Sequence, residues 1–262
     1  MKRKKVITLI AAALAFTMTV CGSSTAIAAS ELTAESKPAT QYTIDANQEV
    51  YALLDFEDTT EFENATKGLL ASPDTLDICD ENGKVVWSQT AYAFLDQDAP
   101  DTANPSLWRD TQLNHIYGLF EVTDGIYQVR GYDMSNITFI KGDTGWIVVD
   151  PLMSVECAQA AFALVEENLG TFPVKAVIYS HSHVDHFGGV RGIISEEDVQ
   201  SGDVQVIAPE GFEKHAVSEN IYAGTAMGRR ASYQYGTMLE GGETGSLAIG
   251  IGMGQSKGST SY

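Results

Sequence analysis

The 262-residue chain has few basic residues. It holds 16 lysines and arginines against 35 aspartates and glutamates, which gives a formal net charge of −19. Such a surplus of negative charge repels nucleic acid and anionic membrane surfaces, so we expect neither as a partner. It would also repel an anionic substrate, and the basic groups that bind one must therefore be placed locally. Solubility alone is the simplest role for the charge.

Cysteine is also scarce, with residues at positions 21, 79 and 157 only. Cys21 lies in a segment that we expect to be removed, and the other two are too far apart in sequence to indicate a disulfide framework. Cys157 lies on an amphipathic helical pattern and is expected to be a small core residue. A bridge between Cys79 and Cys157 is the less favoured alternative.

The apolar run Val6–Val20 is too short to span a membrane comfortably. It follows basic residues at 2–5 and precedes the small-residue sequence at 26–28, so residues 1–29 predict a bacterial signal peptide. Its removal takes four basic residues and changes the net charge from −19 to about −23. We expect an exported protein, secreted or periplasmic, with no transmembrane segment in the mature chain. A lipoprotein anchored through Cys21 ranks second.

Four potential metal ligands follow a predicted buried strand at 174–179. His181 and His183, two apart on extended backbone, point to the same side. Asp185 and His186 come where the chain turns and face a second point. Imidazole and carboxylate without thiolate suit Zn²⁺ or a similar ion, and two ions about 3.5–4 Å apart can share a bridging hydroxide. The alternative is a polar loop whose histidines are satisfied by hydrogen bonds.

This HxHxDH pattern resembles the signature of the metallo-β-lactamase superfamily. From about Glu49 to Tyr262, the chain resembles the linear alkyl sulfatases, zinc hydrolases that desulfate primary alkyl sulfates such as dodecyl sulfate. The stretches that carry the resemblance are residues 104–114, residues 118–152, SHSHVDHFGGVRG and APEGFEKHAVSEN. The resemblance implies an α+β fold, the αββα sandwich, with the metal loops at one edge of two packed sheets. It also implies two zinc ions, an alkyl sulfate substrate and a homodimer for the full-length enzyme.

Asp150 ends a predicted strand and is interpreted as a group that orients a ligand histidine or the metal loop. An aspartate that simply ends the strand in an Asp-Pro turn is the alternative. Further along, Arg229 and Arg230 form an adjacent basic pair beside Tyr233 and Tyr235. Guanidinium and phenol groups suit the oxygens of a sulfate, and the resemblance implies that this segment borders the substrate pocket. The alternative for the segment is a solvated helix end.

The hydrophobic pattern predicts a β-β-α-β order in the second half of the chain. We expect strands at 120–122, 126–129, 137–140, 146–149, 174–179 and 204–208, a helix from the capping residue Ser154 to Gly170, and a helix at 210–220. Upstream, the sequence predicts a flexible stretch at 30–48, a helical stretch at 49–70 and a hairpin strand at 85–87. The predicted organisation is a signal peptide (1–29), a lead-in region (30–115) and the metallo-β-lactamase domain (116–262).

The resembled enzymes add two glutamates and another histidine downstream of the metal loop, and then further domains. This chain has only His215 after His186, and it does not match. We therefore expect the truncated first part of the domain, with one sheet face exposed. Three functions stay open: an alkyl sulfatase with Asp185 as catalytic residue, another hydrolase of the fold acting on a phosphoester, lactone or β-lactam, and a non-catalytic remnant.

Overall fold

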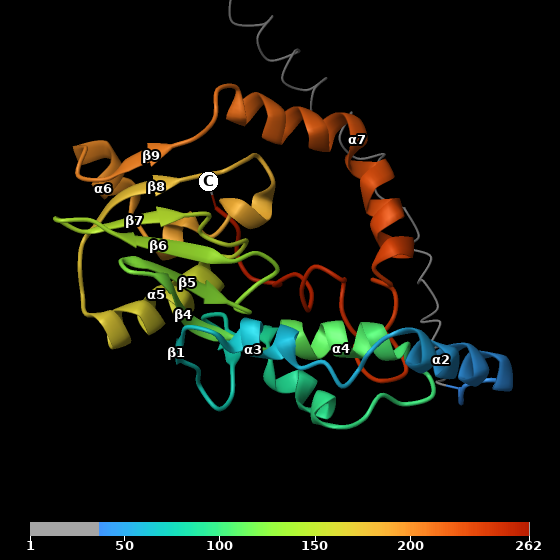
Figure 1. Cartoon of the computed structure of the whole chain (residues 1–262). Coiled ribbons are helices and arrows are strands. Elements are labelled where there is room, and N and C mark those ends of the chain that lie inside the picture. The colour runs from blue at the N-terminus through green and yellow to red at the C-terminus, as the bar shows by residue number, and fades with distance from the viewer. Residues whose placement is uncertain (1–36, 262) are drawn as a thin grey trace, which may run out of the picture. The chain divides into compact units, whose positions relative to one another are not determined.

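A seven-stranded mixed sheet organises the computed structural model, which describes residues 37–261 (Figure 1). The signal peptide predicted at 1–29 lies outside these residues. The strand order is β1 (Leu69–Ala71), β4 (Gly118–Thr123), β5 (Ile126–Arg130), β6 (Ile137–Lys141), β7 (Trp146–Val149), β8 (Val174–Ile178) and β9 (Gln205–Ile207). Neighbours are antiparallel from β1 to β7 and parallel from β7 to β9. A parallel pair needs a crossover, which a helix supplies between β7 and β8.

The remaining elements lie before, between and after these strands. The helices are α2 (Gln41–Leu53), α3 (Thr60–Thr66), α4 (Pro105–Asn114), α5 (Val155–Leu169), α6 (Glu196–Ser201) and α7 (Phe212–Gln234). Strands β2 (Asp77–Cys79) and β3 (Val85–Ser88) form a separate hairpin. The short 3₁₀ helices are η1 (Thr90–Asp96), η2 (Val184–His186) and η3 (Val190–Gly192). No described helix combines the length and apolar character that crossing a membrane requires.

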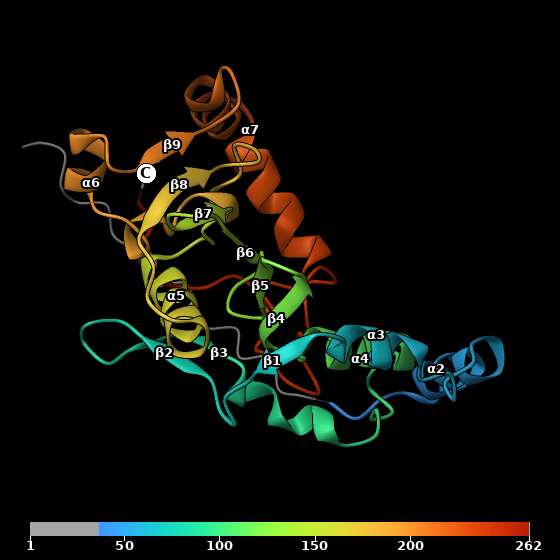
Figure 2. The ribbon, with the colours of Figure 1, turned by 60° about the vertical axis from the view of Figure 1, so that its left-hand side comes forward.

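The strands and helix of the predicted β-β-α-β order are confirmed, whereas three predictions upstream and downstream are wrong in extent. The helical stretch predicted at 49–70 is broken between Leu53 and Thr60 and ends before β1. The stretch predicted to be flexible up to residue 48 contains most of α2, because Thr40 caps its first turn by accepting from the Thr43 N–H. The helix predicted at 210–220 continues to Gln234. Figure 2 shows this long helix, α7, leaving the sheet after β9.

The main core lies between one sheet face and α5. Phe139, Trp146 and Val148 project from this face and are fully buried. Phe162 of α5 stacks on Phe139, with ring centroids 5.8 Å apart. Cys157 is buried in the same helix as a free thiol, as predicted for a small core residue.

The opposite sheet face is only partly covered. Ile126, Ile140 and Ile147 lie side by side on it in the strand register and are half-buried, while Ile207 on β9 is 46% exposed. Within residues 37–261, the other sheet is the β2–β3 hairpin. It packs against α5 and therefore does not cover this face. The predicted αββα sandwich is thus present in part, as one large sheet with its outer helix.

The lead-in region is continuous with the sheet. Strand β1 pairs with β4, so residues before the boundary predicted at 115/116 complete the sheet edge. The contacts among residues 37–262 define one unit. The boundary stays a prediction about evolutionary origin, but packing does not break there.

The segment 253–261 returns to the core and joins three distant parts of the chain. The Lys257 N–H donates to the Val86 carbonyl, the Val155 N–H donates to the Ser259 carbonyl, and the Ser261 N–H donates to the Gly188 carbonyl. Ser154 was predicted to cap α5, and it occupies that position without making a capping bond. Its hydroxyl forms a hydrogen bond with the Ser256 hydroxyl instead, at 2.9 Å.

Candidate metal centre

The loop that follows β8 carries the predicted ligands and packs tightly against the loop that follows β7. A Cβ at Gly189 would overlap the Pro151 carbonyl oxygen, and one at Gly188 would overlap the Met153 carbonyl oxygen. Glycine is required here because backbone meets backbone without room for a side chain. The two loops therefore form one layer at the edge where β7 and β8 end.

Asp150 connects the two loops. It adopts a left-handed conformation with φ 56°, which is unusual for a residue other than glycine. Its carboxylate accepts hydrogen bonds from the Ser180 N–H (2.7 Å), the Ser180 hydroxyl (2.6 Å) and His186 Nδ1 (2.9 Å). Burial raises the pKa of Asp150, but the hydrogen bonds from His186 and Ser180 outweigh it and lower the pKa overall. The carboxylate is thus held ionised in a fixed orientation.

His186 lies between two carboxylates. Its Nδ1 contacts Asp150, and its Nε2 is 3.0 Å from Asp185 Oδ2. Burial alone would lower the pKa of His186, yet the hydrogen bonds to Asp150 and Asp185 raise it to about 9. Burial likewise raises the pKa of Asp185, and the hydrogen bond from His186 brings it below its ordinary value. The raised pKa therefore favours an imidazolium at neutral pH, between the two carboxylates.

The other two histidines stand next to this group. The His181 ring centroid is 4.1 Å from that of His186 and 4.7 Å from that of His183. His181 Nδ1 is 2.9 Å from the Ser180 hydroxyl, and His183 Nε2 is 3.6 Å from Glu219 of α7. Burial and the neighbouring positive charges of His186 and His183 lower the pKa of His181. The structure thus brings all four predicted ligands together.

The donor types of this cluster suit a metal, although the atoms are not arranged around one. Among the described residues, no group of three or more histidine, cysteine or acidic side chains is placed to hold an ion. The proton shared by His186 Nε2 and Asp185 lies where an imidazole and a carboxylate could share a cation instead. The Asp150–His186 bond is the carboxylate–histidine contact that fixes the tautomer of metal-binding histidines. By this test of donor chemistry, the residues fit a metal.

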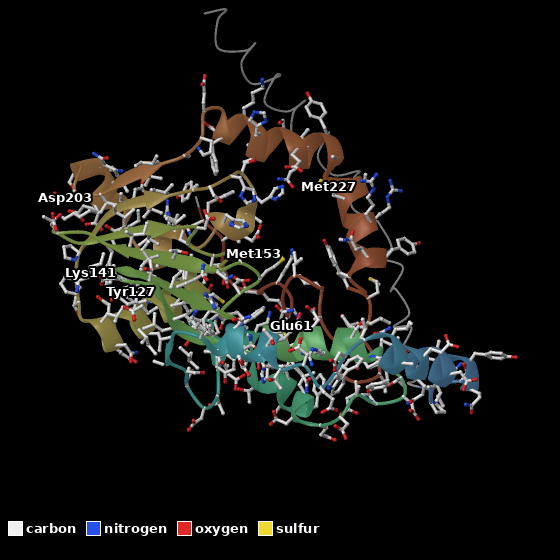
Figure 3. All side chains as sticks on the ribbon, viewed as in Figure 1. Glu61, Tyr127, Lys141, Met153, Asp203 and Met227 are labelled. Carbon is white, nitrogen blue, oxygen red and sulfur yellow. The ribbon has the colours of Figure 1, made fainter. Side chains whose placement is uncertain are left out.

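The predicted substrate-binding residues lie elsewhere. Arg229, Arg230 and Tyr233 are exposed on the last turns of α7, and Tyr235 ends that helix. Arg229 is ten residues beyond Glu219, about 15 Å along a helix axis at 1.5 Å per residue. Figure 3 shows Met227 of this stretch well apart from Met153, which follows β7. The structure does not bring these four side chains to the histidines, and their role stays a prediction.

Two contacts at the centre were not anticipated. The Ser135 hydroxyl donates to the backbone carbonyl of Asp185, and Glu219 approaches His183. Ser135 comes from the loop between β5 and β6, and Glu219 comes from α7. Neither lies near the histidine motif in sequence, so no local pattern could have indicated them.

The protonated His186 gives a prediction about pH. Because its pKa in the folded protein is raised from 6.5 to about 9, its stabilising contribution is complete below 6.5 and is lost as the pH rises through about 9. In chelator, the melting temperature of the wild type should therefore exceed that of His186→Gln by more at about pH 6 than at about pH 10. Thermal unfolding monitored by circular dichroism measures this difference. A gap that widened with pH would contradict the assignment.

The part of the chain that carries the metal loop is similar to a known family. Residues 130–254 match the family model "Metallo-beta-lactamase superfamily". That part of the chain is similar to metallo-beta-lactamase domains, a superfamily that implies metal binding. The match includes β6 to β9, the metal loop and α7.

Sequence relatives indicate a narrower class of protein, because the homologues of this chain are alkylsulfatases. A linear primary-alkylsulfatase from Pseudomonas sp. is 51% identical over 225 residues, which are 85% of this chain and 33% of that protein. The alkyl/aryl-sulfatase BDS1 of Saccharomyces cerevisiae is 48% identical, covering 82% of this chain and 34% of that protein. The chain spans about a third of the length of these curated relatives.

A solved structure agrees with the sequence relatives. The stereoselective inverting sec-alkylsulfatase Pisa1 from Pseudomonas sp. is 50% identical, with a TM-score of 0.79. The similarity covers 86% of this chain and 36% of that chain. The resemblance to alkyl sulfatases indicated by the sequence is thereby confirmed.

Proposed function

We propose that this protein is a zinc-dependent alkylsulfatase that hydrolyses linear alkyl sulfate esters to an alcohol and sulfate. The observation that carries the proposal is the identity of about half of all aligned residues to a linear primary-alkylsulfatase over 85% of the chain. The histidine and aspartate side chains at the ends of β7 and β8 supply the donors that such chemistry needs.

In this proposal, His181 and His183 hold one zinc ion, and Asp185 and His186 hold a second. A bound zinc ion would supply a water of lowered pKa and an electrophile for the ester oxygens. Asp150 accepts a hydrogen bond from His186 Nδ1, so that Nε2 would be the nitrogen to bind the metal once it gives up its proton. Asp185, fixed through its backbone carbonyl by Ser135, would keep its carboxylate at the reacting group.

The decisive experiment measures zinc content and sulfate release on the same purified protein. We expect zinc to bind in proportion to protein and dodecyl sulfate to be hydrolysed, with both lost in chelator and restored by zinc. Zinc binding without release of sulfate from alkyl esters of any chain length would reject the substrate class. Failure to bind zinc at all would favour a non-catalytic protein.

The basic pair on α7 is tested separately. We expect Arg230→Ala to leave the zinc content unchanged and to raise the KM for dodecyl sulfate, because the guanidinium would bind the anion before and during reaction alike. Steady-state kinetics with metal analysis distinguishes this outcome. Loss of zinc in the variant would show that Arg230 has a structural role.

Export and assembly are also proposals. We propose that residues 1–29 direct the protein out of a bacterial cell and that the alkylsulfatase acts as a homodimer. N-terminal sequencing of the exported protein would identify the cleavage site, and a lipid on Cys21 would indicate the anchored alternative. Sedimentation analysis measures the assembly state, for which a monomer at micromolar concentration would contradict the dimer.

A further inference from the structure

The side chain of Arg130 is held in a fixed position at the end of β5. Its guanidinium lies over the ring of Phe120, with 4.4 Å between the central carbon and the ring centroid. Its Nε donates to Gln128 Oε1 at 2.7 Å, and the Gln128 amide donates in turn to the Thr138 hydroxyl at 3.1 Å. Phe120 is fully buried beneath it. These contacts fix the plane of the guanidinium and leave both terminal nitrogens available.

The positive charge of Arg130 has no acidic partner within residues 37–261. Arg109 forms an ion pair with Glu61, and Arg191 forms one with Glu196. In contrast, the terminal nitrogens of Arg130 make no ion pair or hydrogen bond to any described residue. The side chain is half-buried, and burial lowers the pKa of the guanidinium. A partly desolvated charge of this kind gains most from an anion that it can bind through two parallel hydrogen bonds.

Arg130 lines a cavity of about 150 Å³ together with the polar residues Asn114 and Asn136 and the apolar residues Leu113 and Ile116. The Asn114 amide donates one N–H to Asp110 at 3.3 Å, so its second N–H remains for a ligand. Guanidinium and amide N–H groups together can donate to several oxygens of one anion. The apolar residues suit the first carbons of an alkyl group attached to that anion.

A carboxylate also lines the cavity but does not neutralise Arg130. The oxygens of Asp133 accept hydrogen bonds from the N–H groups of Met134, Met153 and Ser256, and from the Ser256 hydroxyl. These donors come from the backbone around the cavity and from the C-terminal segment. The oxygens of the Asp133 carboxylate are thus already hydrogen-bonded within the fold.

Hydrogen bonds connect the cavity wall with the loops of the candidate metal centre. Ser135 immediately precedes Asn136 of the cavity wall, and its hydroxyl donates to the Asp185 carbonyl. Strands β5 and β7 are each antiparallel to β6, so Arg130 and Asp150 lie at the same edge of the sheet. A ligand in the cavity would therefore lie at the same sheet edge as the metal loop.

We propose that Arg130, together with the amides of Asn114 and Asn136, forms a binding site for a tetrahedral oxyanion. The anion is the sulfate group of an alkyl ester or free inorganic sulfate, and assignment to the ester rests on the proposed alkylsulfatase function. The site provides the local positive charge that an anionic substrate needs on a protein with a net charge of −19. Figure 2 shows β5, which carries this arginine, in the middle of the sheet.

The test measures anion binding without catalysis, on the purified protein in chelator. Isothermal titration with sodium sulfate and with hexanesulfonate, which cannot be hydrolysed, compares wild type, Arg130→Gln, Arg130→Lys and the control Arg191→Gln. Loss of a charge-assisted pair of hydrogen bonds should weaken binding of both anions about tenfold or more in Arg130→Gln. Arg130→Lys should weaken binding as well, because an ammonium cannot form the planar fork. Arg191→Gln should bind as the wild type does.

The two anions distinguish the sources of the ligand. Tighter binding of hexanesulfonate than of sulfate supports an ester site, whereas equal affinities support a site for the free oxyanion. Wild-type affinity in both Arg130 variants, or no binding by the wild type, would overturn the proposal. If Arg130→Gln does not fold by circular dichroism, the comparison of Arg130→Lys with wild type decides. Because no turnover is measured, the site stands or falls independently of sulfatase activity.

Discussion

Replacement of His186 by alanine is expected to remove most of the zinc and to lower alkylsulfatase activity by about 100-fold or more. His186 is the central side chain of the cluster, since Asp150 and Asp185 both bind its ring. Without it, the carboxylates face each other with no positive group between them. Zinc analysis and initial rates of sulfate release measure the two effects on one sample.

His215→Ala is the matched control for that variant. His215 is exposed in the first turn of α7, outside the cluster of His181, His183 and His186. We expect its replacement to leave zinc content and activity unchanged. Equal losses in both variants would indicate general unfolding, and full zinc occupancy in His186→Ala would show that His186 is not a ligand.

The second large effect is expected at Gly189, where alanine should destabilise the protein by about 3 kcal/mol. Its Cβ would overlap the Pro151 carbonyl oxygen and would lie 2.6 Å from the Ser154 carbonyl oxygen and 2.8 Å from the Ala158 Cβ. Two of these neighbours are backbone atoms, which cannot move aside as a flexible side chain can. The metal loop would have to separate from the loop after β7.

Urea unfolding measures this effect against Gly228→Ala as a control. Gly228 lies within α7, and a Cβ there would meet nothing within 4 Å. Alanine favours a helix over glycine by about 1 kcal/mol, so this variant should be equally or more stable than the wild type. Wild-type stability of Gly189→Ala would show that the two loops are not packed as described.

The sequence predicted the elements in which a hydrophobic pattern and a packed face coincide. Strands β4 to β8 and helix α5 bury alternate or helically spaced apolar residues, and Gly170 ends the helix with φ 91°. Helix α7 buries no residue, so its apolar pattern held no information about its length. The early start of α2 was missed for the same reason, since none of its residues is buried.

At the candidate site, the sequence indicated the residues that are neighbours along the chain. The HxHxDH motif brought together His181, His183, Asp185 and His186, and the interpretation of Asp150 anticipated its contact with His186. Arg130 was not singled out, because its environment is built across strands by Phe120 and Gln128. Cross-strand neighbours depend on register, which single-residue patterns do not specify.

The return of the segment 253–261 has a consequence for how the chain acquires its structure. Its bonds close long loops: Ser256 is 123 residues from Asp133 in sequence, and Ser261 is 73 residues from Gly188. During synthesis from the N-terminus, the metal loop therefore leaves the ribosome well before the residues that secure it. Contacts between residues so far apart in sequence slow folding, because chain entropy is lost before they form. We expect the sheet to form first and the metal loop to become protected from hydrogen exchange only after residues 253–261 have docked.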